Sequence, residues 1–267
     1  MPSEAAWWCL VPFGIAAVLL HAGTNVLNDY YDYLHGVDTI GDRDTSHVIT
    51  QGVMTPRFMK ISGHLYFLAG IAVGSTIAVT RGPLYFVAGL LGALGAYSYT
   101  NARLSLKYHA LGDLAVFVLM GPALVVMGVW ALEGTLVATA PLASIPVAML
   151  VTAILHGNNT RNIAEDTAAG ISTLAGLLGF GPSKLLFAGL VGASYAVTVA
   201  LVSFGTVGLG ALLAFLSLPF GVSLVRTVLS AESPTLLLRL PMSTAQVHLV
   251  FSVFYVLGIF LGGLTGL

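Results

Sequence analysis

The chain has 267 residues, of which 57% are hydrophobic and only 8% are charged, and its formal net charge is −1. Soluble domains carry about 25% charged residues, so this composition excludes an ordinary soluble protein and indicates an integral membrane protein. The net charge favours no particular partner, and no nucleic-acid partner is expected. Cys9 is the single cysteine, which excludes an internal disulfide framework and a metal site built from cysteines.

The apolar runs of the chain have the length of membrane-spanning helices, which need about 20 mostly apolar residues. Short segments of alternating hydrophobicity, which are typical of a membrane β-barrel, do not occur, so the sequence predicts an all-α membrane protein. Eight spans are expected, at residues 7–27, 61–80, 84–100, 111–132, 136–156, 184–203, 206–228 and 247–266.

The loops between these spans alternate in character. The first (28–60), third (101–110), fifth (157–183) and seventh (229–246) are polar, and the others are short. Nine of the ten Lys and Arg residues lie in or beside the polar loops, and only Arg81 lies in a short one. The positive-inside rule therefore predicts that the polar loops are cytoplasmic. With eight spans, both chain ends would face the opposite side.

Carboxylates are concentrated at the end of the first span. The stretch NVLNDYYDYLHGVD brings Asp29, Asp32 and Asp38 within ten positions, in a chain with only 11 acidic residues. On a helix, residues three and four apart share a face. Asn25, Asn28, Asp29 and Asp32 are therefore expected to form one polar stripe.

A second polar stretch, HGNNTRNIAEDTAAG, lies at the end of the fifth span. Asn158, Asn162 and Asp166 step by four, and Glu165 lies three beyond Asn162, so their oxygens are expected to point inward together. Ionisable residues at membrane depth are costly and usually functional. The alternative is that these groups only face interfacial water or cap the next segment.

Clusters of oxygen ligands suit hard cations, above all Mg²⁺. Mg²⁺ binds one or two carboxylates and completes its shell with water and substrate phosphates, so two such clusters suggest a diphosphate held between them through metal ions. Arg43, Lys107 and Arg161 are expected to meet the phosphate oxygens, although Arg43 is equally well explained as a positive-inside anchor. Stabilising a departing diphosphate is electrostatic catalysis by metal and cationic donors.

Other polar residues have weaker signals. Tyr97 and Tyr99 close the third span, where an interfacial aromatic belt explains them as well as a role toward substrate. Asp113 is expected either to cap the fourth helix or to orient Lys107. Four histidines near span ends lack the spacing of a metal site and are expected to have packing or interface roles: His21, His64, His156 and His248.

Two signatures, NDYYDYLHGVD (28–38) and NNTRNIAEDTAAGISTLAGLLG (158–179), resemble those of the UbiA superfamily of intramembrane aromatic prenyltransferases. The segment YTNARLSLKYHALGD (99–113), with LPMSTA and FYVLGIFL near the end, is similar to the menaquinone-type branch. This branch includes the 1,4-dihydroxy-2-naphthoate prenyltransferases and the animal UbiA-domain enzyme that makes a menaquinone. The resemblance implies one prenyltransferase domain over residues 1–267, folded as a helical bundle that has nine helices in the family.

The resemblance also implies an activity. A polyprenyl group would pass from an allylic diphosphate, such as geranylgeranyl diphosphate, to an aromatic quinol acceptor in menaquinone biosynthesis. Mg²⁺ would be the cofactor and the lipid bilayer the surroundings. Two alternatives stay open: a different acceptor, aromatic or a glycerol phosphate lipid, and a non-catalytic membrane homologue that binds isoprenoids.

Site residues follow by similarity. The implied metal ligands are Asn28, Asp29, Asp32 and Asp38 in the first motif and Asn162 and Asp166 in the second. The implied diphosphate contacts are Arg43, Lys107 and Arg161. The expected catalytic residues are Asp32, Asp166, Lys107 and Tyr99, the last near the reacting prenyl carbon. Contacts to the acceptor are expected from Asn158 and Asn159.

The chain departs from the family pattern in two places. The second motif normally begins with Asp, where this chain has Asn162, whose amide oxygen can ligate Mg²⁺ without contributing charge. Glu165, about one turn further on, is a candidate to compensate. The family also has a helix before the one with the first motif, so we expect that this chain is truncated or lacks that helix.

Overall fold

The computed structural model describes residues 6–34, 36, 48–101 and 105–265. Every regular element within these ranges is a helix, which confirms the all-α prediction. Asp38 lies outside the described residues, as does Arg43, so their predicted roles stay predictions.

Seven helices in the described part of the chain are long and apolar enough to cross a bilayer, so the chain is a multi-pass integral membrane protein. They are Trp7–Leu34, Pro56–Arg81, Gly112–Glu133, Ala140–Arg161, Phe180–Ser203, Leu209–Ser230 and Leu240–Leu264. The remaining predicted span, 84–100, is present as helix α3 (Pro83–Thr100). It falls outside this set because it ends in Tyr-Ser-Tyr-Thr, which lowers its mean hydropathy.

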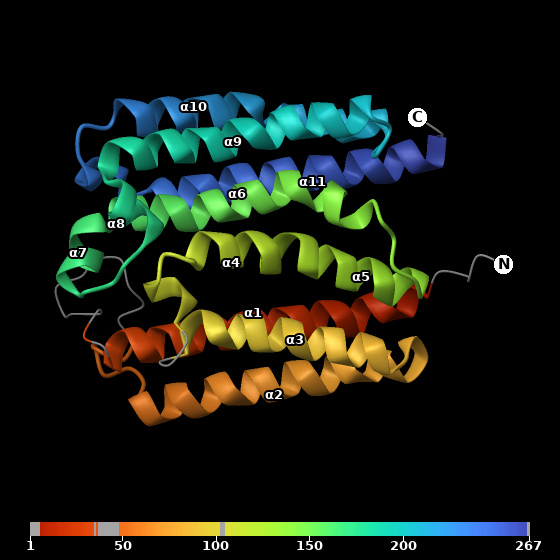
Figure 1. Ribbon diagram of the computed structural model, residues 1–267, viewed down its shortest axis with the longest axis horizontal. Helices are drawn as coiled ribbons and strands as arrows, with labels where there is room; N and C mark the ends of the chain where they lie inside the picture. The colour runs from red at the N-terminus through yellow and green to blue at the C-terminus, as the bar shows by residue number, and fades with distance from the viewer. Residues whose placement is uncertain (1–5, 35, 37–47, 102–104, 266–267) are drawn as a thin grey trace. The chain divides into compact units, whose positions relative to one another are not determined.

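The chain divides into two compact units. The first comprises Met1–His109, Ala123–Val137 and Ala168–Ile171. Its main helices are α1 (Leu10–Leu34), α2 (Pro56–Arg81), α3 and α5 (Leu124–Glu133). Within this unit α1, α2 and α3 run side by side (Figure 1).

Helices α1 and α2 approach each other closely because glycines lie where they meet. A Cβ atom on Gly63 of α2 would lie 2.7 Å from the side chain of Leu27, and one on Gly23 of α1 would lie 2.8 Å from Phe67. Real Cβ contacts are not that short, so a side chain at either position would force Leu27 or Phe67 to shift. Small residues serve the same purpose in membrane helix pairs generally, where close van der Waals packing drives association.

The second unit comprises Ala110–Pro122, Ala138–Thr167 and Ser172–Leu267. Its helices are α4 (Gly112–Val118), α6 (Ala140–Arg161), α7 (Ile163–Ala168), α8 (Leu174–Leu178), α9 (Phe180–Ser203), the 3₁₀ helix η4 (Leu209–Ser217), α10 (Leu218–Ser230), the 3₁₀ helix η5 (Pro234–Leu237) and α11 (Leu240–Thr265). Figure 1 shows α6 lying along both α9 and α11 in this unit.

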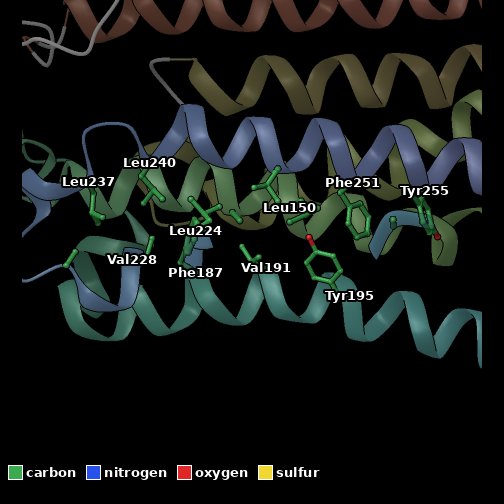
Figure 2. Close-up of a cluster of buried hydrophobic side chains, with 14 of the residues drawn as sticks. Leu150, Phe187, Val191, Tyr195, Leu224, Val228, Leu237, Leu240, Phe251 and Tyr255 are labelled. Atoms are coloured by element: carbon green, nitrogen blue, oxygen red, sulfur yellow. The ribbon is translucent and has the colours of Figure 1, made fainter. Parts of the chain in front are cut away.

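One apolar core holds the second unit together. Leu150 of α6, Phe187 of α9 and Phe251 of α11 are fully buried in one cluster, which Figure 2 shows. Gly210 of η4 and Gly258 of α11 meet backbone to backbone, with no room for a side chain on either residue. The elements that carry the second polar stretch are therefore anchored in a closely packed interior.

The predicted span 111–132 is one helical run that changes its winding. Between α4 and α5, residues Leu119–Ala123 form a π-helical turn, η3, that contains Pro122. Proline lacks the backbone N–H and its ring crowds the preceding turn, and a local π-turn accommodates this within a continuous helix.

Candidate active site

The first polar motif is helical. The first span is predicted to end at residue 27, but α1 continues to Leu34, because no Gly or Pro interrupts the chain until Gly36, which has a φ of +69°. Asn28 and Asp32 therefore stand one turn apart, and Asn28 Nδ2 donates to Asp32 Oδ2 at 2.8 Å. The predicted polar stripe is confirmed for this pair.

Asp32 is the centre of a hydrogen-bonded cluster in the first unit. Its side chain is 8% exposed and that of Lys107 is 17% exposed. Lys107 Nζ donates to Asp32 Oδ2 at 2.6 Å and to Asn28 Oδ1 at 3.1 Å. The Tyr108 hydroxyl donates to Asp32 Oδ1. Both carboxylate oxygens are thus engaged, and a cationic group already lies between two oxygens that the sequence assigned to a metal ion.

Lys107 and Tyr108 are presented by a short 3₁₀ turn, η2 (Leu106–Tyr108), which follows a strained residue. Ser105 has a φ of +31°, a conformation that residues other than glycine rarely adopt. It is held there because its amide and its hydroxyl both donate to the Asn101 carbonyl, at 2.8 and 2.6 Å. Such a strained conformation persists only where several surrounding contacts hold it, and it occurs most often at functional sites.

Tyr108 is a site residue that the sequence did not predict. It lies 76 residues from Asp32, and no local spacing connects the two positions. The only available signal was its place beside Lys107 in a segment that also carries the family resemblance.

Aromatic side chains from α1, α2 and α3 pack together in the same unit. Tyr31 and Phe67 are buried together, and Tyr97 packs edge-on against Phe67 at 5.5 Å between ring centroids. His64 Nε2 lies 3.3 Å from the Tyr97 hydroxyl, which agrees with the expected packing role of this histidine. Tyr99 is partly buried on the last turn of α3, and its role toward substrate stays a prediction.

The second polar motif also lies on a helix that outlasts its predicted span. α6 continues beyond residue 156 to Arg161, with Asn162 as its C-cap residue. Arg161 Nη2 donates to Asn158 Oδ1 and its Nε donates to Asn162 Oδ1, both at 2.8 Å. Arg161 Nη1 also donates to the Leu238 carbonyl at 3.2 Å. As in the first motif, a basic side chain of the protein itself binds the amide oxygens of the motif.

The two acidic residues of this motif differ in exposure. Asp166 is buried in α7, whereas its neighbour Glu165 is exposed. Neighbouring residues on a helix point about 100° apart, which explains the difference. Any compensation by Glu165 for the missing charge at Asn162 would therefore come from an exposed carboxylate.

Asp113 has a partner that the sequence did not predict. It lies in the first turn of α4, and its Oδ2 is 2.6 Å from His156 Nδ1. His156 is fully buried, and its Nε2 lies 3.2 Å from the Ser183 carbonyl of α9. Asn159 Nδ2 donates to Asp113 Oδ1 at 3.4 Å. His156 is thus buried, in line with its expected packing role, and it also has Asp113 as a hydrogen-bonding partner.

The carboxylate and amide oxygens of the two motifs suit a hard cation that the substrate also helps to bind. Within the described residues, no three His, Cys, Asp or Glu side chains form a self-contained metal site. The oxygens at hand are single carboxylates with neighbouring amides, and those of Asn28 and Asp32 already share one ammonium group. Mg²⁺ characteristically takes one or two carboxylates and completes its shell with water and phosphate, so this donor set suits it.

Comparison with known proteins gives a consistent result. The model of the UbiA prenyltransferase family matches residues 1–239. The human UbiA prenyltransferase domain-containing protein 1 is 32% identical over 256 residues, covering 94% of this chain and 73% of the relative. The 1,4-dihydroxy-2-naphthoate octaprenyltransferase of Bacillus subtilis (strain 168) is 30% identical over 241 residues, covering 90% of this chain and 77% of the relative.

Solved structures show the same fold at lower identity. A UbiA homologue from Archaeoglobus fulgidus, bound to DMAPP and Mg²⁺, has a TM-score of 0.60 at 16% identity, and the match covers 96% of this chain and 90% of that one. A digeranylgeranylglyceryl phosphate synthase has a TM-score of 0.65 at 14% identity, over 96% of this chain and 87% of that one. With the family model and both curated relatives in agreement, the chain belongs to the UbiA prenyltransferase family.

Proposed function

We propose that this chain transfers a polyprenyl group from an allylic diphosphate to an aromatic quinol in menaquinone synthesis. The observation that carries the proposal is the cluster at the end of α1, where the partly buried Asn28 and the buried Asp32 meet Lys107 and Tyr108. The similarity to an enzyme named for its naphthoate acceptor supports the choice of acceptor class.

The residues proposed to hold Mg²⁺ are Asn28, Asp29, Asp32 and Asp38 of the first motif and Asn162 and Asp166 of the second. When bound, Mg²⁺ would supply Lewis-acid neutralisation of the charge that develops on the departing diphosphate. Carboxylate oxygens and amide oxygens accept hydrogen bonds, so these oxygens would meet the anionic substrate through the cation rather than directly.

Lys107 and Arg161 are the proposed direct contacts to the diphosphate, together with Arg43. Each of the two described cations is held by motif oxygens, at 2.6 Å for Lys107 and 2.8 Å for Arg161. These cations can donate charge-assisted hydrogen bonds to non-bridging phosphate oxygens. Such preorganised donors stabilise the charge of the leaving group without reorganisation during the reaction.

The proposed reaction breaks the allylic C–O bond, and its electron pair leaves with the diphosphate. A ring carbon of the quinol gives an electron pair to the allylic carbon, and the ring regains aromaticity by losing a proton or, from a naphthoate, its carboxylate as carbon dioxide. Tyr99 is proposed to lie near the allylic carbon, and Asn158 and Asn159 near the acceptor. Exclusion of water by apolar helices would protect the allylic cation from hydrolysis.

We further propose that the motif-bearing helix ends face the cytoplasm, because nine of the ten Lys and Arg residues lie in or beside the loops at these ends. The whole of residues 1–267 is proposed to act as one prenyltransferase domain. The family model supports residues 1–239 of this range.

The proposal is tested by prenyl transfer in membranes that contain this chain. Geranylgeranyl diphosphate is supplied with 1,4-dihydroxy-2-naphthoate or menadiol, with and without Mg²⁺, and Asp32→Asn serves as a matched variant without the carboxylate. The expected result is a Mg²⁺-dependent prenylated naphthoquinone that the variant does not form. Absence of product, while the Bacillus relative is active in parallel, would refute the proposal.

One observation favours a non-catalytic isoprenoid-binding role instead. Asn162 replaces the Asp expected in the second motif, and its amide oxygen is bound by Arg161. A binding protein of this kind would retain radiolabelled geranylgeranyl diphosphate in membranes without forming any prenylated product, so the same assay separates the two functions.

A further inference from the structure

A polar chain crosses the interior of the second unit, and only Asn159, at its end, has a role in the reaction proposed above. It runs from Asn159 through Asp113 and His156 to the Ser183 carbonyl, and so joins α6, α4 and α9. Asp113 is 6% exposed, Asn159 is 5% exposed and His156 is fully buried. Polar groups buried in this way are stable only when they are fully paired.

The hydrogen positions in this chain follow from its acceptors. A backbone carbonyl can only accept, so His156 Nε2, 3.2 Å from the Ser183 oxygen, carries a hydrogen. One further proton lies between His156 Nδ1 and Asp113 Oδ2, which are 2.6 Å apart. The pair is thus neutral as a unit, whichever partner holds that proton, and Asp113 Oδ1 remains an acceptor for the amide of Asn159.

This arrangement determines which way the Asn159 amide points. Its Nδ2 faces the Asp113 carboxylate at 3.4 Å, and among the described residues this is the hydrogen bond that its side chain makes. Oδ1 is then the atom left to receive a donor from outside. The neighbouring Asn158 is held in the opposite sense, because its Oδ1 accepts from Arg161 at 2.8 Å.

We propose that Asp113 and His156 are positioning residues that hold Asn159 so that its Oδ1 accepts a hydrogen bond from a ring hydroxyl of the acceptor. The proposal rests on the function proposed above and names the group of the quinol that is selected. An amide oxygen cannot bond directly to the oxygens of a diphosphate, since both are acceptors. It does suit a hydroxyl donor, and a site built for a hydroxyl rejects analogues that lack one.

The test is equilibrium binding, which needs no turnover. Dissociation constants are measured by calorimetry under anaerobic conditions for 1,4-dihydroxy-2-naphthoate and for its 1,4-dimethyl ether, with wild-type protein and with Asn159→Ala. Selectivity is the ratio of the dissociation constant of the dimethyl ether to that of the free naphthoate. This ratio should be about tenfold larger for the wild-type protein than for Asn159→Ala, as expected for one hydrogen bond in a buried site. The affinity for geranylgeranyl diphosphate should be unchanged.

Two substitutions separate positioning from folding. Asp113→Asn can still accept from Asn159 through its oxygen and should retain the selectivity, whereas Asp113→Leu should lose it as Asn159→Ala does. Thr152→Ala is the matched control, because Thr152 is a buried residue of the same helix and its hydroxyl donates along that helix, to the Ala148 carbonyl at 2.8 Å. This variant should bind as wild type, and thermal unfolding of each purified variant checks its fold.

Equal selectivity in wild type and Asn159→Ala overturns the proposal, as does a loss of geranylgeranyl diphosphate affinity instead of acceptor selectivity. Wild-type protein that binds neither naphthoate compound also overturns it. If the predicted selectivity is found while the membranes form no prenylated product, the function proposed above is wrong, but the hydrogen bond between Asn159 and the ring hydroxyl is supported.

Discussion

Replacing Lys107 by Met tests whether this lysine occupies the position of a metal ion. Its Nζ lies 2.6 Å from Asp32 Oδ2, and both side chains are largely buried, at 17% and 8% exposure. Methionine keeps the length of the stem and removes the charge. Asp32 then lacks its counter-ion, so a divalent cation should bind more tightly in the absence of diphosphate, while diphosphate itself should bind more weakly.

The size of the effect follows from the burial of the pair. Two unit charges 2.6 Å apart attract by about 6 kcal/mol at an effective dielectric constant of about 20, and truncating one partner of a buried pair costs about 3–5 kcal/mol. If a bound cation recovers a third of about 4 kcal/mol, its affinity rises by about 1.3 kcal/mol, which is close to tenfold.

The assay uses Mn²⁺ alone as a paramagnetic probe, with free Mn²⁺ measured by electron paramagnetic resonance on protein in detergent. Lys107→Met should lower the dissociation constant about tenfold and lower kcat/KM for prenyl transfer about a hundredfold. Lys184→Met is the control, because Lys184 bonds the Leu229 and Ala231 carbonyls at the end of α10 and should leave Mn²⁺ binding unchanged. Unchanged or weaker Mn²⁺ binding by Lys107→Met would refute the reasoning.

Asp32→Ala and Asp166→Ala should each lower prenyl transfer by about 10²–10³-fold, because each removes a carboxylate proposed to bind Mg²⁺; wild-type rates in membranes would remove that residue from the site. Asn162→Asp should lower the Mg²⁺ concentration needed for half-maximal rate by about threefold to tenfold, since it adds a negative charge to the ligand set. If a Mg²⁺ titration shows that this concentration rises instead, Arg161 neutralises the new carboxylate; its Nε lies 2.8 Å from Asn162 Oδ1. Tyr108→Phe should lower kcat/KM about tenfold by removing a hydrogen bond to a charged group, with an unfolding temperature close to that of wild type; unaltered kinetics would assign Tyr108 to packing alone.

The sequence determined the features that depend on local spacing and composition. The apolar runs predicted the membrane-spanning helices, because hydropathy is a property of each segment by itself. Spacing by four predicted that Asn28 and Asp32 share a face, and they are joined by a hydrogen bond. Spacing also predicted that Asn158 and Asn162 belong together, and the Arg161 guanidinium binds both.

Helix ends could not be read from hydropathy, and long-range partners were decided only by the tertiary structure. Hydropathy placed helix ends at residues 27 and 156, but the helices run on to Leu34 and Arg161, because backbone hydrogen bonding does not stop where apolar residues stop. Tyr108 meets Asp32 across 76 residues. His156 likewise meets a carboxylate 43 residues away. No sequence spacing encodes such pairs, since they form only when the chain reverses direction and packs one helix against another.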